Sequence, residues 1–221
     1  MTEPADPIAV LVSGGLDSAV LLAEQVAAGR TVYPLYVRGG LYWEAAEMEH
    51  LGRFLSAVAA PNLRPLHVLE APARDLYGDH WAVTGRGVPA AGTADAAVYL
   101  PGRNVLLLTK AILWCHLRGV PAVALGTLAA NPFPDATPAF IETLARVTNE
   151  AVGGSVRVLR PYAGLPKSEV VRRGAGFPLE HTFSCLRPVD GRPCGACNKC
   201  EERRQALAEV GKINGRGRAR E

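Results

Sequence analysis

The sequence lacks an apolar run long enough to cross a membrane. Its apolar stretches, such as 105–108 and 111–115, are separated by Thr109 and Lys110, and they stay well below the roughly 20 residues that a membrane-spanning helix requires. Residues 1–7 contain two acidic side chains and lack the basic start and apolar core of a secretory signal. These absences predict a cytoplasmic protein that acts without a membrane partner.

The sequence also has little net charge of either sign. It contains 24 Lys and Arg residues against 21 Asp and Glu residues, which gives +3 at neutral pH. Residues 212–221 hold four basic side chains and one acidic side chain, so this segment supplies the whole excess. A nearly neutral body is not typical of proteins that bind nucleic-acid backbones. We therefore expect no stable nucleic-acid binding, and we interpret 212–221 as a basic, flexible tail.

The composition and the apolar pattern are typical of a folded α/β domain. Apolar residues make up 48% and charged residues 20% of the 221 residues, within the range of globular proteins. Short apolar segments rich in β-branched residues alternate with segments of helical periodicity. This alternation predicts a Rossmann-like, parallel five-stranded sheet with helices on both faces. The expected strands are 8–12, 31–37, 66–69, 122–125 and 156–159, and the expected helices are 19–27, 43–59, 104–117 and 138–152.

Two regions fall outside this alternation. Residues 71–100 are rich in Gly, Pro and Thr and show no clear period, which is typical of a lid or a binding loop. After residue 159 the sequence predicts a short helix at 167–173, a cysteine-rich segment, and a last helix at 201–210. We accordingly divide the chain into an α/β nucleotide-binding domain (1–180), a small zinc-binding helical segment (181–211) and the tail (212–221).

The segment Ser13-Gly14-Gly15-Leu16-Asp17-Ser18 stands between the first expected strand and the first expected helix. Its two glycines allow a tight turn and a close approach of the backbone to a ligand. Unpaired amides at the helix start, together with the helix dipole, favour phosphate binding, and the hydroxyls of Ser13 and Ser18 can add donors. The alternative is an ordinary turn in which Asp17 and Ser18 cap the helix.

This hexapeptide resembles the PP-loop of ATP pyrophosphatases, which split ATP into AMP and pyrophosphate as they adenylate an oxygen atom. The resemblance implies a fold like that of the adenine nucleotide alpha-hydrolases, with ATP and Mg²⁺ as cofactors. It implies catalytic roles for Ser13, Asp17 and Ser18, with Asp17 positioning Mg²⁺ or the leaving group. Arg103 and Lys167 are the candidates for basic groups near the polyphosphate; for each, the alternative is a solvated charge at a helix end. The implied nucleotide-binding residues are Val12, Ser13, Gly14, Gly15, Leu16, Asp17, Ser18, Ala19, Val20, Leu21 and Leu22.

Four of the five cysteines lie close together near the C-terminal end: Cys185, Cys194, Cys197 and Cys200. Four thiolates that include Cys-x2-Cys spacings can complete a tetrahedral zinc site, and in a reducing compartment they indicate a metal before disulfides. An iron–sulfur cluster is the alternative. Because four protein ligands leave no open coordination position, we expect a structural Zn²⁺. The fifth cysteine, Cys115, lies in a helical apolar run and is interpreted as a core residue.

Taken together, the motifs resemble those of the 7-cyano-7-deazaguanine synthase family. Besides the PP-loop and the cysteines, the resemblance rests on Leu100-Pro101-Gly102-Arg103-Asn104, residues 134–141, Lys167-Ser168-Glu169-Val170 and Phe183-Ser184-Cys185. It covers most of the chain. It implies an enzyme that converts 7-carboxy-7-deazaguanine, ammonia and ATP into 7-cyano-7-deazaguanine (preQ0), the precursor of queuosine. A homodimer with one zinc ion per subunit is also implied.

The substrate pocket is expected at 71–100 and 126–138, beyond the carboxyl ends of the strands. Asp135 can accept hydrogen bonds from an exocyclic amine and a ring N–H, so we assign it to substrate binding together with Arg103 and Asn104. A turn or capping role is the alternative for Asp135. Segment 126–138 departs from the family pattern, because Ala136-Thr137 replaces Cys-Arg and an Asp-Tyr-type stretch is missing. Lys110 and His116 are also unexpected in their helix.

These departures leave two alternatives to a synthase of this kind. A related PP-loop ligase would amidate a deazaguanine or another carboxylate, or conjugate it to a different amine. A non-catalytic, zinc-bearing nucleic-acid binding module would bind RNA in a salt-dependent manner without ATP turnover. The intact loop and the nearly neutral body favour the enzyme, an adenylating, ATP-dependent carbon–nitrogen ligase.

Overall fold

The centre of the molecule is a five-stranded sheet. The computed structural model describes residues 6–218, with side chains described through residue 209. The strand order is β3-β2-β1-β4-β5, and every neighbouring pair is parallel, which confirms the predicted sheet. Because the order reverses at β1, a crevice forms at its carboxyl end, where open α/β sheets bind ligands. The strands are β1 (Ile8–Leu11), β2 (Val32–Arg38), β3 (His67–Glu70), β4 (Ala122–Ala124) and β5 (Arg157–Leu159).

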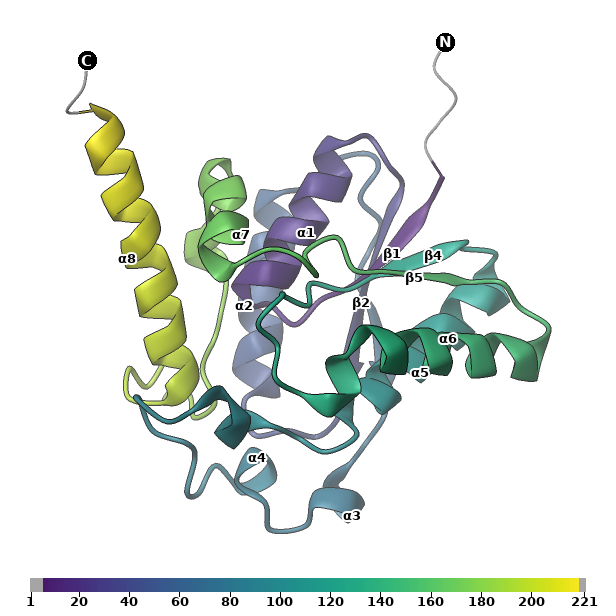
Figure 1. The fold of residues 1–221 in the computed structure, drawn as a ribbon, viewed down its shortest axis with the longest axis horizontal. Helices are drawn as coiled ribbons and strands as arrows, with labels where there is room; N and C mark the ends of the chain where they lie inside the picture. The colour runs from purple at the N-terminus through teal and green to yellow at the C-terminus, as the bar shows by residue number, and fades with distance from the viewer. Residues whose placement is uncertain (1–5, 219–221) are drawn as a thin grey trace.

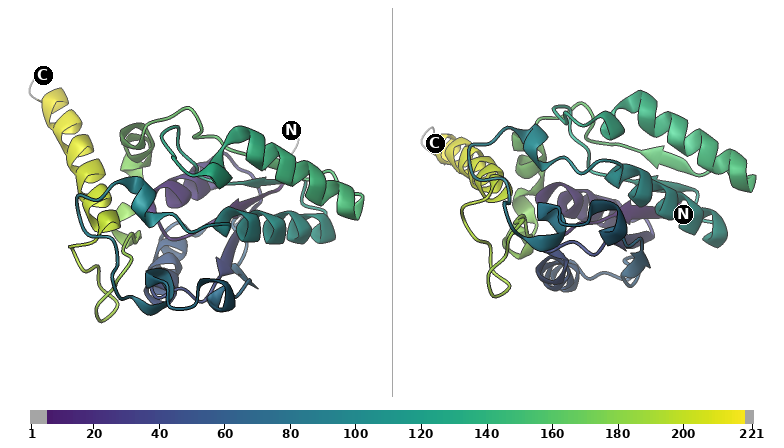
Figure 2. Two further views of the ribbon diagram at one scale, coloured as in Figure 1. Left: turned by 60° about the horizontal axis from the view of Figure 1, so that its bottom comes forward. Right: turned by 90° about the horizontal axis from the view of Figure 1, so that it is seen from below.

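Helices cover both faces of this sheet, as the alternation predicted (Figure 1). One face carries α1 (Leu16–Ala27), α2 (Glu44–Ala57) and α7 (Lys167–Arg173). The other face carries α5 (Arg103–Arg118) and α6 (Pro138–Val152), which lie side by side (Figure 2). Helix α8 (Asn198–Arg218) packs against α7 at one side of the molecule. Within residues 6–218, short 3-10 helices occur at η1 (Asp95–Val98), η2 (Pro134–Ala136), η3 (Gly174–Gly176) and η4 (Leu179–His181).

The buried apolar side chains form one cluster on each face of the sheet and a third cluster near the cysteines. Ile8 and Val10 of β1 belong to the first cluster and Ala9 to the second, because successive side chains of a strand point to opposite faces. The third cluster joins Cys185 and Cys197 to residues of the 71–100 region, including Ala82 and Val98. The cysteine segment therefore shares a core with the predicted lid.

Residues 71–100 are more ordered than the predicted irregular loop. They contain α3 (Arg74–Tyr77), α4 (Trp81–Thr84) and η1, each only four residues long and thus too short to show a helical period. Tertiary packing holds them in place. Trp81, for example, stacks on Trp43 at the start of α2, with ring centroids 5.9 Å apart.

The last helix is longer than the predicted 201–210. It begins at Asn198, within the cysteine motif, and continues to Arg218, so the backbone of 212–218 is helical rather than an irregular tail. Residues 219–221 lie outside the described part of the chain, and the three-part division remains a prediction. Cys115 is fully buried, as predicted, whereas Lys110 is exposed. Across residues 6–218, we find no helix with both the length and the apolar character that crossing a membrane demands.

Candidate active site and metal centre

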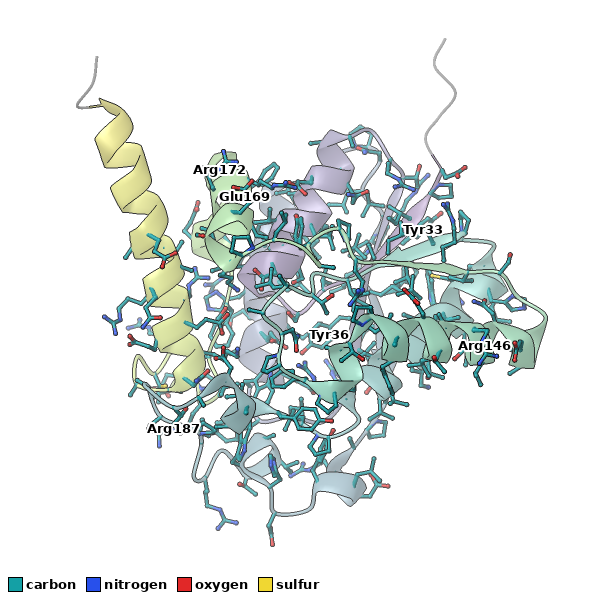
Figure 3. All side chains as sticks on the ribbon, in the orientation of Figure 1. Tyr33, Tyr36, Arg146, Glu169, Arg172 and Arg187 are labelled. Carbon is teal, nitrogen blue, oxygen red and sulfur yellow. The ribbon has the colours of Figure 1, made fainter. Side chains whose placement is uncertain are left out.

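A cavity of about 400 Å³ opens at the carboxyl ends of β1, β2 and β4. Its walls come from the loop after β1, the start of α5, the segment after β4, and the starts of α7 and α8. Tyr36, which Figure 3 labels near the middle of the molecule, contributes to the lining. The polar lining residues are Ser13, Asp17, Ser18, Tyr36, Asp95, Arg103, Asn104, Thr127, Asn131, Lys167, Lys199 and Glu202. The cavity thus brings together the predicted loop with both predicted basic groups.

The loop between β1 and α1 is held by its own serines. The backbone N–H of Ser13 donates to Ser18 Oγ over 3.2 Å, and Ser18 Oγ donates to the carbonyl of Gly15 over 3.2 Å. Gly15 is the N-cap of α1, and no side chain caps it. The alternative role of Asp17 and Ser18 as helix caps is therefore not observed, and the helix start faces the cavity, in the arrangement that favours an anion.

Glycine is required at one turn of this loop. Gly14 has φ +71°, and a Cβ there would lie 3.1 Å from the backbone carbonyl oxygen of Glu47 in α2. Of the predicted nucleotide-binding segment, Val12, Ser13, Gly15, Asp17 and Ser18 line the cavity. The other side chains of this segment pack in the core and hold the start of α1 against it: Leu16 and residues 19–22.

Four charged side chains form a network along one wall. Lys167 Nζ lies 2.6 Å from Asp17 Oδ2 and 3.2 Å from Glu202 Oε1. Glu202 also pairs with Lys199. Lys167 is therefore an ion-paired group at the cavity wall rather than a solvated charge at a helix end, and the network ties α1, α7 and α8 together.

Burial and pairing oppose each other in this network. Burial raises the pKa of Asp17 above its ordinary value, and the ion pair with Lys167 offsets this only in part. Burial alone would lower the pKa of Lys167, but the two carboxylates outweigh it and raise that pKa. For Glu202, burial is likewise outweighed, and the two lysines lower its pKa. Asp17 is thus the member whose charge is least compensated.

Two polar atoms at the cavity are buried without a hydrogen-bond partner among the described residues. They are Asp17 Oδ1 and Thr127 Oγ1. A buried acceptor without a partner is costly, and a carboxylate oxygen is a ligand that Mg²⁺ prefers. The residues present therefore fit a cation beside Asp17, where it would stabilise negative charge in the cavity.

Asp135 does not line the cavity but holds a residue that does. Its Oδ2 accepts from the backbone N–H of Asn104, and its Oδ1 accepts from Asn104 Nδ2, both over 3.1 Å. Asp135 is buried in η2. It therefore holds the start of α5, a role close to the predicted capping alternative, and direct contact between Asp135 and a substrate remains a prediction.

If the predicted acid and ATP are the substrates, we expect Asp135→Asn to raise the Michaelis constant for the acid several-fold more than that for ATP. Asparagine keeps one acceptor for Asn104 but replaces the other with a donor, so Asn104 loses its fixed orientation at the cavity. Steady-state kinetics with each substrate varied in turn measures the split. Equal constants for variant and parent would show that neither Asp135 nor the orientation of Asn104 matters for the acid.

Sequence reasoning missed several cavity residues. Lys199 lies between Cys197 and Cys200, and Glu202 lies two residues after Cys200. This closeness to the cysteines was the only feature of the sequence that could have pointed to them. Phe133 lines the cavity and stacks on Tyr99, with ring centroids 5.1 Å apart. No sequence pattern distinguishes this pair from ordinary core aromatics.

The four predicted metal ligands come together. The Sγ atoms of Cys185, Cys194, Cys197 and Cys200 all lie within 4.8 Å of one another, and those of Cys194 and Cys200 are 4.0 Å apart. Sulfurs around a tetrahedral zinc with Zn–S bonds of about 2.3 Å would be separated by about 3.8 Å. The donor set and its spacing therefore fit a structural Zn²⁺.

The cysteine segment is bonded to the 71–100 region. The amide of Ala91 donates to the carbonyl of Ala196, and the amide of Asn198 donates to the carbonyl of Pro89, both over 2.9 Å. Asn198 Nδ2 also donates to the carbonyl of Thr93 over 2.8 Å. The proposed metal centre thus anchors the chain just before Asp95, which lines the cavity.

This arrangement of loop, cavity and cysteines can be compared with known proteins. The family model of the queuosine biosynthesis protein QueC matches residues 8–211. The chain belongs to the QueC family. The matched range takes in the PP-loop, the charged network and all four cysteines, so the family resemblance predicted from the motifs is confirmed.

Individual members of the QueC family align over nearly the whole chain. The 7-cyano-7-deazaguanine synthase of Anaeromyxobacter dehalogenans is 34% identical, with 95% of this chain and 94% of that one covered. The synthase of Thiobacillus denitrificans is 31% identical, with coverages of 91% and 93%. Among solved structures, NMN synthetase from Francisella tularensis is 15% identical with a TM-score of 0.50, covering 96% of this chain and 78% of that one. This last likeness concerns the fold alone.

Proposed function

We propose that the protein converts 7-carboxy-7-deazaguanine and ammonia into 7-cyano-7-deazaguanine at the expense of ATP. The single observation that carries the proposal is the cavity at the switch point of the sheet, where the PP-loop faces Lys167 and Arg103. Relatives named 7-cyano-7-deazaguanine synthase, which align over nine-tenths of the chain or more, support the choice of substrate.

In this proposal, groups of the chain bind the pyrophosphate portion of ATP and stabilise its negative charge as it leaves. The amides at the start of α1, with the hydroxyls of Ser13 and Ser18, hold the pyrophosphate portion of ATP. Lys167 and Arg103 stabilise the negative charge that builds up on it. Asp17 would hold Mg²⁺, which would supply further charge neutralisation when bound. The acid oxygen attacks the α-phosphorus, pyrophosphate leaves, and the acid becomes an adenylate.

The adenylate makes the carbonyl carbon reactive toward ammonia. Nitrogen attacks that carbon, AMP leaves, and an amide forms. Activation of the amide oxygen in a second round turns that oxygen into a leaving group, and its loss gives the nitrile. The same loop and basic side chains serve both rounds, because each round splits ATP into AMP and pyrophosphate.

A second candidate is a QueC-like ligase that stops at the amide or joins the acid to another amine. It is favoured by segment 126–138, where Ala136-Thr137 departs from the family pattern and where Asn131 and Phe133 line the cavity. The two candidates share the first adenylation and differ in product. A nitrile identifies the synthase, and an amide or a conjugate identifies the ligase.

The deciding experiment incubates the purified protein with ATP, Mg²⁺, ammonium and 7-carboxy-7-deazaguanine, with mass analysis of the products. We expect AMP, pyrophosphate and the nitrile, and no AMP when the acid is omitted. AMP formation that requires a different acid would overturn the choice of substrate. Salt-sensitive RNA binding with no ATP turnover would contradict an enzymatic function and favour the non-catalytic nucleic-acid binding module.

A further inference from the structure

A buried carboxyl group lies behind the cavity wall, outside the charged network described above. Glu47 in α2 is 8% exposed, and its backbone carbonyl stands against Gly14 of the PP-loop. Its Oε2 accepts a hydrogen bond from the hydroxyl of Tyr36 over 2.7 Å. Burial raises the pKa of Glu47 to about 7, although Arg103 and the bond from Tyr36 act in the opposite direction.

The tyrosine connects this carboxyl group to the cavity. Tyr36 lies in the carboxyl half of β2 and lines the cavity together with Arg103 and the PP-loop serines. Burial raises the pKa of Tyr36, and the neighbouring Glu47 raises it further. The hydroxyl therefore stays protonated, and it can pass its proton to Glu47 only as it takes up another, which is how a relay through a hydroxyl operates.

The other described carboxylates at or beside the cavity are already engaged or open to solvent. Asp17 and Glu202 pair with lysines, Asp135 accepts from Asn104, Glu44 accepts from two backbone amides, and Asp95 is exposed. Glu47 alone in this group is bonded to a neutral hydroxyl that borders the cavity. A base that is not neutralised by a lysine is what a reaction that releases a proton requires.

We propose that Tyr36 takes the proton released when the nitrogen nucleophile attacks the activated carboxyl carbon, and that Glu47 receives the proton through Tyr36. This inference rests on the proposed function. The nitrogen–carbon bond forms and the carbon–oxygen bond to AMP breaks. One nitrogen proton moves to the Tyr36 oxygen as the hydroxyl proton moves to Glu47 Oε2, and Glu47 later releases it to water. Tyr36 is the catalytic residue, and Glu47 acts through it.

The direction of the pH dependence follows from the ionised form that accepts the proton. Glu47 must be a carboxylate, so the amination rate rises as the pH rises through the pKa of Glu47, near 7. The groups that act on Glu47 are Tyr36 from β2, Arg103 from α5 and Glu44 on its own helix. The 3-10 helix η4, which also packs against α2, carries Glu180 and His181, and neither is among these groups.

Two half-reactions measured separately test the relay. Isotope exchange between pyrophosphate and ATP, with acid and without ammonium, reports adenylation. Product formation at a fixed concentration of free ammonia, over a range of pH, reports amination. For Glu47→Gln we expect a rate of isotope exchange within about two-fold of the parent rate and a rate of amination at least about 100-fold lower. We also expect the amination rate of this variant to lose its rise near pH 7. We expect Tyr36→Phe to show the same split.

The chain supplies a matched control for these variants. The Tyr162 hydroxyl donates to Glu24 Oε2 over 2.6 Å, the same kind of contact, and neither residue lines the cavity. Glu24→Gln should leave both half-reactions unchanged. Glutamine at residue 47 still accepts from Tyr36, so a purely structural role would leave amination at the parent rate, and that result overturns the assignment of Glu47. A parent without acid-dependent exchange overturns the proposed function itself, and the relay with it.

Discussion

Replacing Asp17 with asparagine is expected to lower AMP formation by at least about a hundredfold, the loss typical when one preorganised electrostatic group is removed from an active site. Asp17 lines the cavity; its Oδ2 is hydrogen-bonded to Lys167, and its buried Oδ1 has no hydrogen-bond partner among the described residues. Asparagine keeps the size and one acceptor oxygen but removes the charge that would hold Mg²⁺. The rate is measured as AMP formed with the acid and ammonium present.

The same substitution is expected to leave stability unchanged or to raise it. Burial places the pKa of Asp17 above its unfolded value, so the folded chain binds this proton more tightly than the unfolded chain does. Its favourable contribution is therefore present at low pH and is lost as the pH rises through the folded pKa. Burial opposes the negative charge of Asp17, and a neutral asparagine avoids that cost while Lys167 keeps its ion pair with Glu202 at 3.2 Å.

The combination of lost activity and retained stability separates a functional role from a structural one. Thermal melting at pH 7 should give a Tm for Asp17→Asn no lower than that of the parent. Asp79→Asn is the matched control, because the side chain of Asp79 is almost fully exposed and should affect neither rate nor melting. Parent-like AMP formation by Asp17→Asn would remove Asp17 from the reaction, and a large fall in Tm would make it a structural residue.

The parts of the fold and site that the sequence predicts are those with local patterns. Strand β1, which contains Val10 and Leu11, is buried on both faces, so its sequence is a continuous apolar run that can be recognised as a strand. Gly14 and Gly15 mark the turn, because only a residue without Cβ tolerates φ +71° and the approach to Glu47. The cysteine spacing predicted which four sulfurs come together, since short Cys-x2-Cys loops bring sulfurs close with little dependence on the rest of the fold.

The parts that could not be predicted depend on contacts between distant segments. Lys167 and Asp17 are 150 residues apart, and a PP-loop resemblance alone could not show that they pair with each other. Asp135 was assigned to the substrate from its hydrogen-bonding capacity, whereas its contact with Asn104, 31 residues away, arises from the packing of η2 against α5. The Tyr36–Glu47 bond likewise exists only once β2 and α2 are packed.

The largest expected change in stability comes from Cys197→Ser. A serine hydroxyl is a poor substitute for a thiolate, so the four-ligand site loses most of its affinity for zinc. Structural zinc supplies roughly 10–16 kcal/mol in small peptides. If about 4 kcal/mol is lost here, the Tm of a chain of this size falls by about 10 °C. Thermal melting and elemental analysis of protein purified without chelators measure the two effects together.

Loss of this centre should also loosen the chain beside the cavity. Cys197 forms a β-bridge with Ala90, and the flanking residues Ala196 and Asn198 are hydrogen-bonded to 89–93. Because this segment leads into Asp95 at the cavity, its amides should exchange hydrogen faster in Cys197→Ser, whereas those of β1 should not. Cys115→Ala is the matched control: it removes a buried sulfur from the core and should lower Tm by a few degrees while one zinc ion per chain is kept. Zinc-free parent protein, or full stability of Cys197→Ser, would contradict a structural metal centre, because a tetrahedron that contributes to folding cannot lose a ligand without effect.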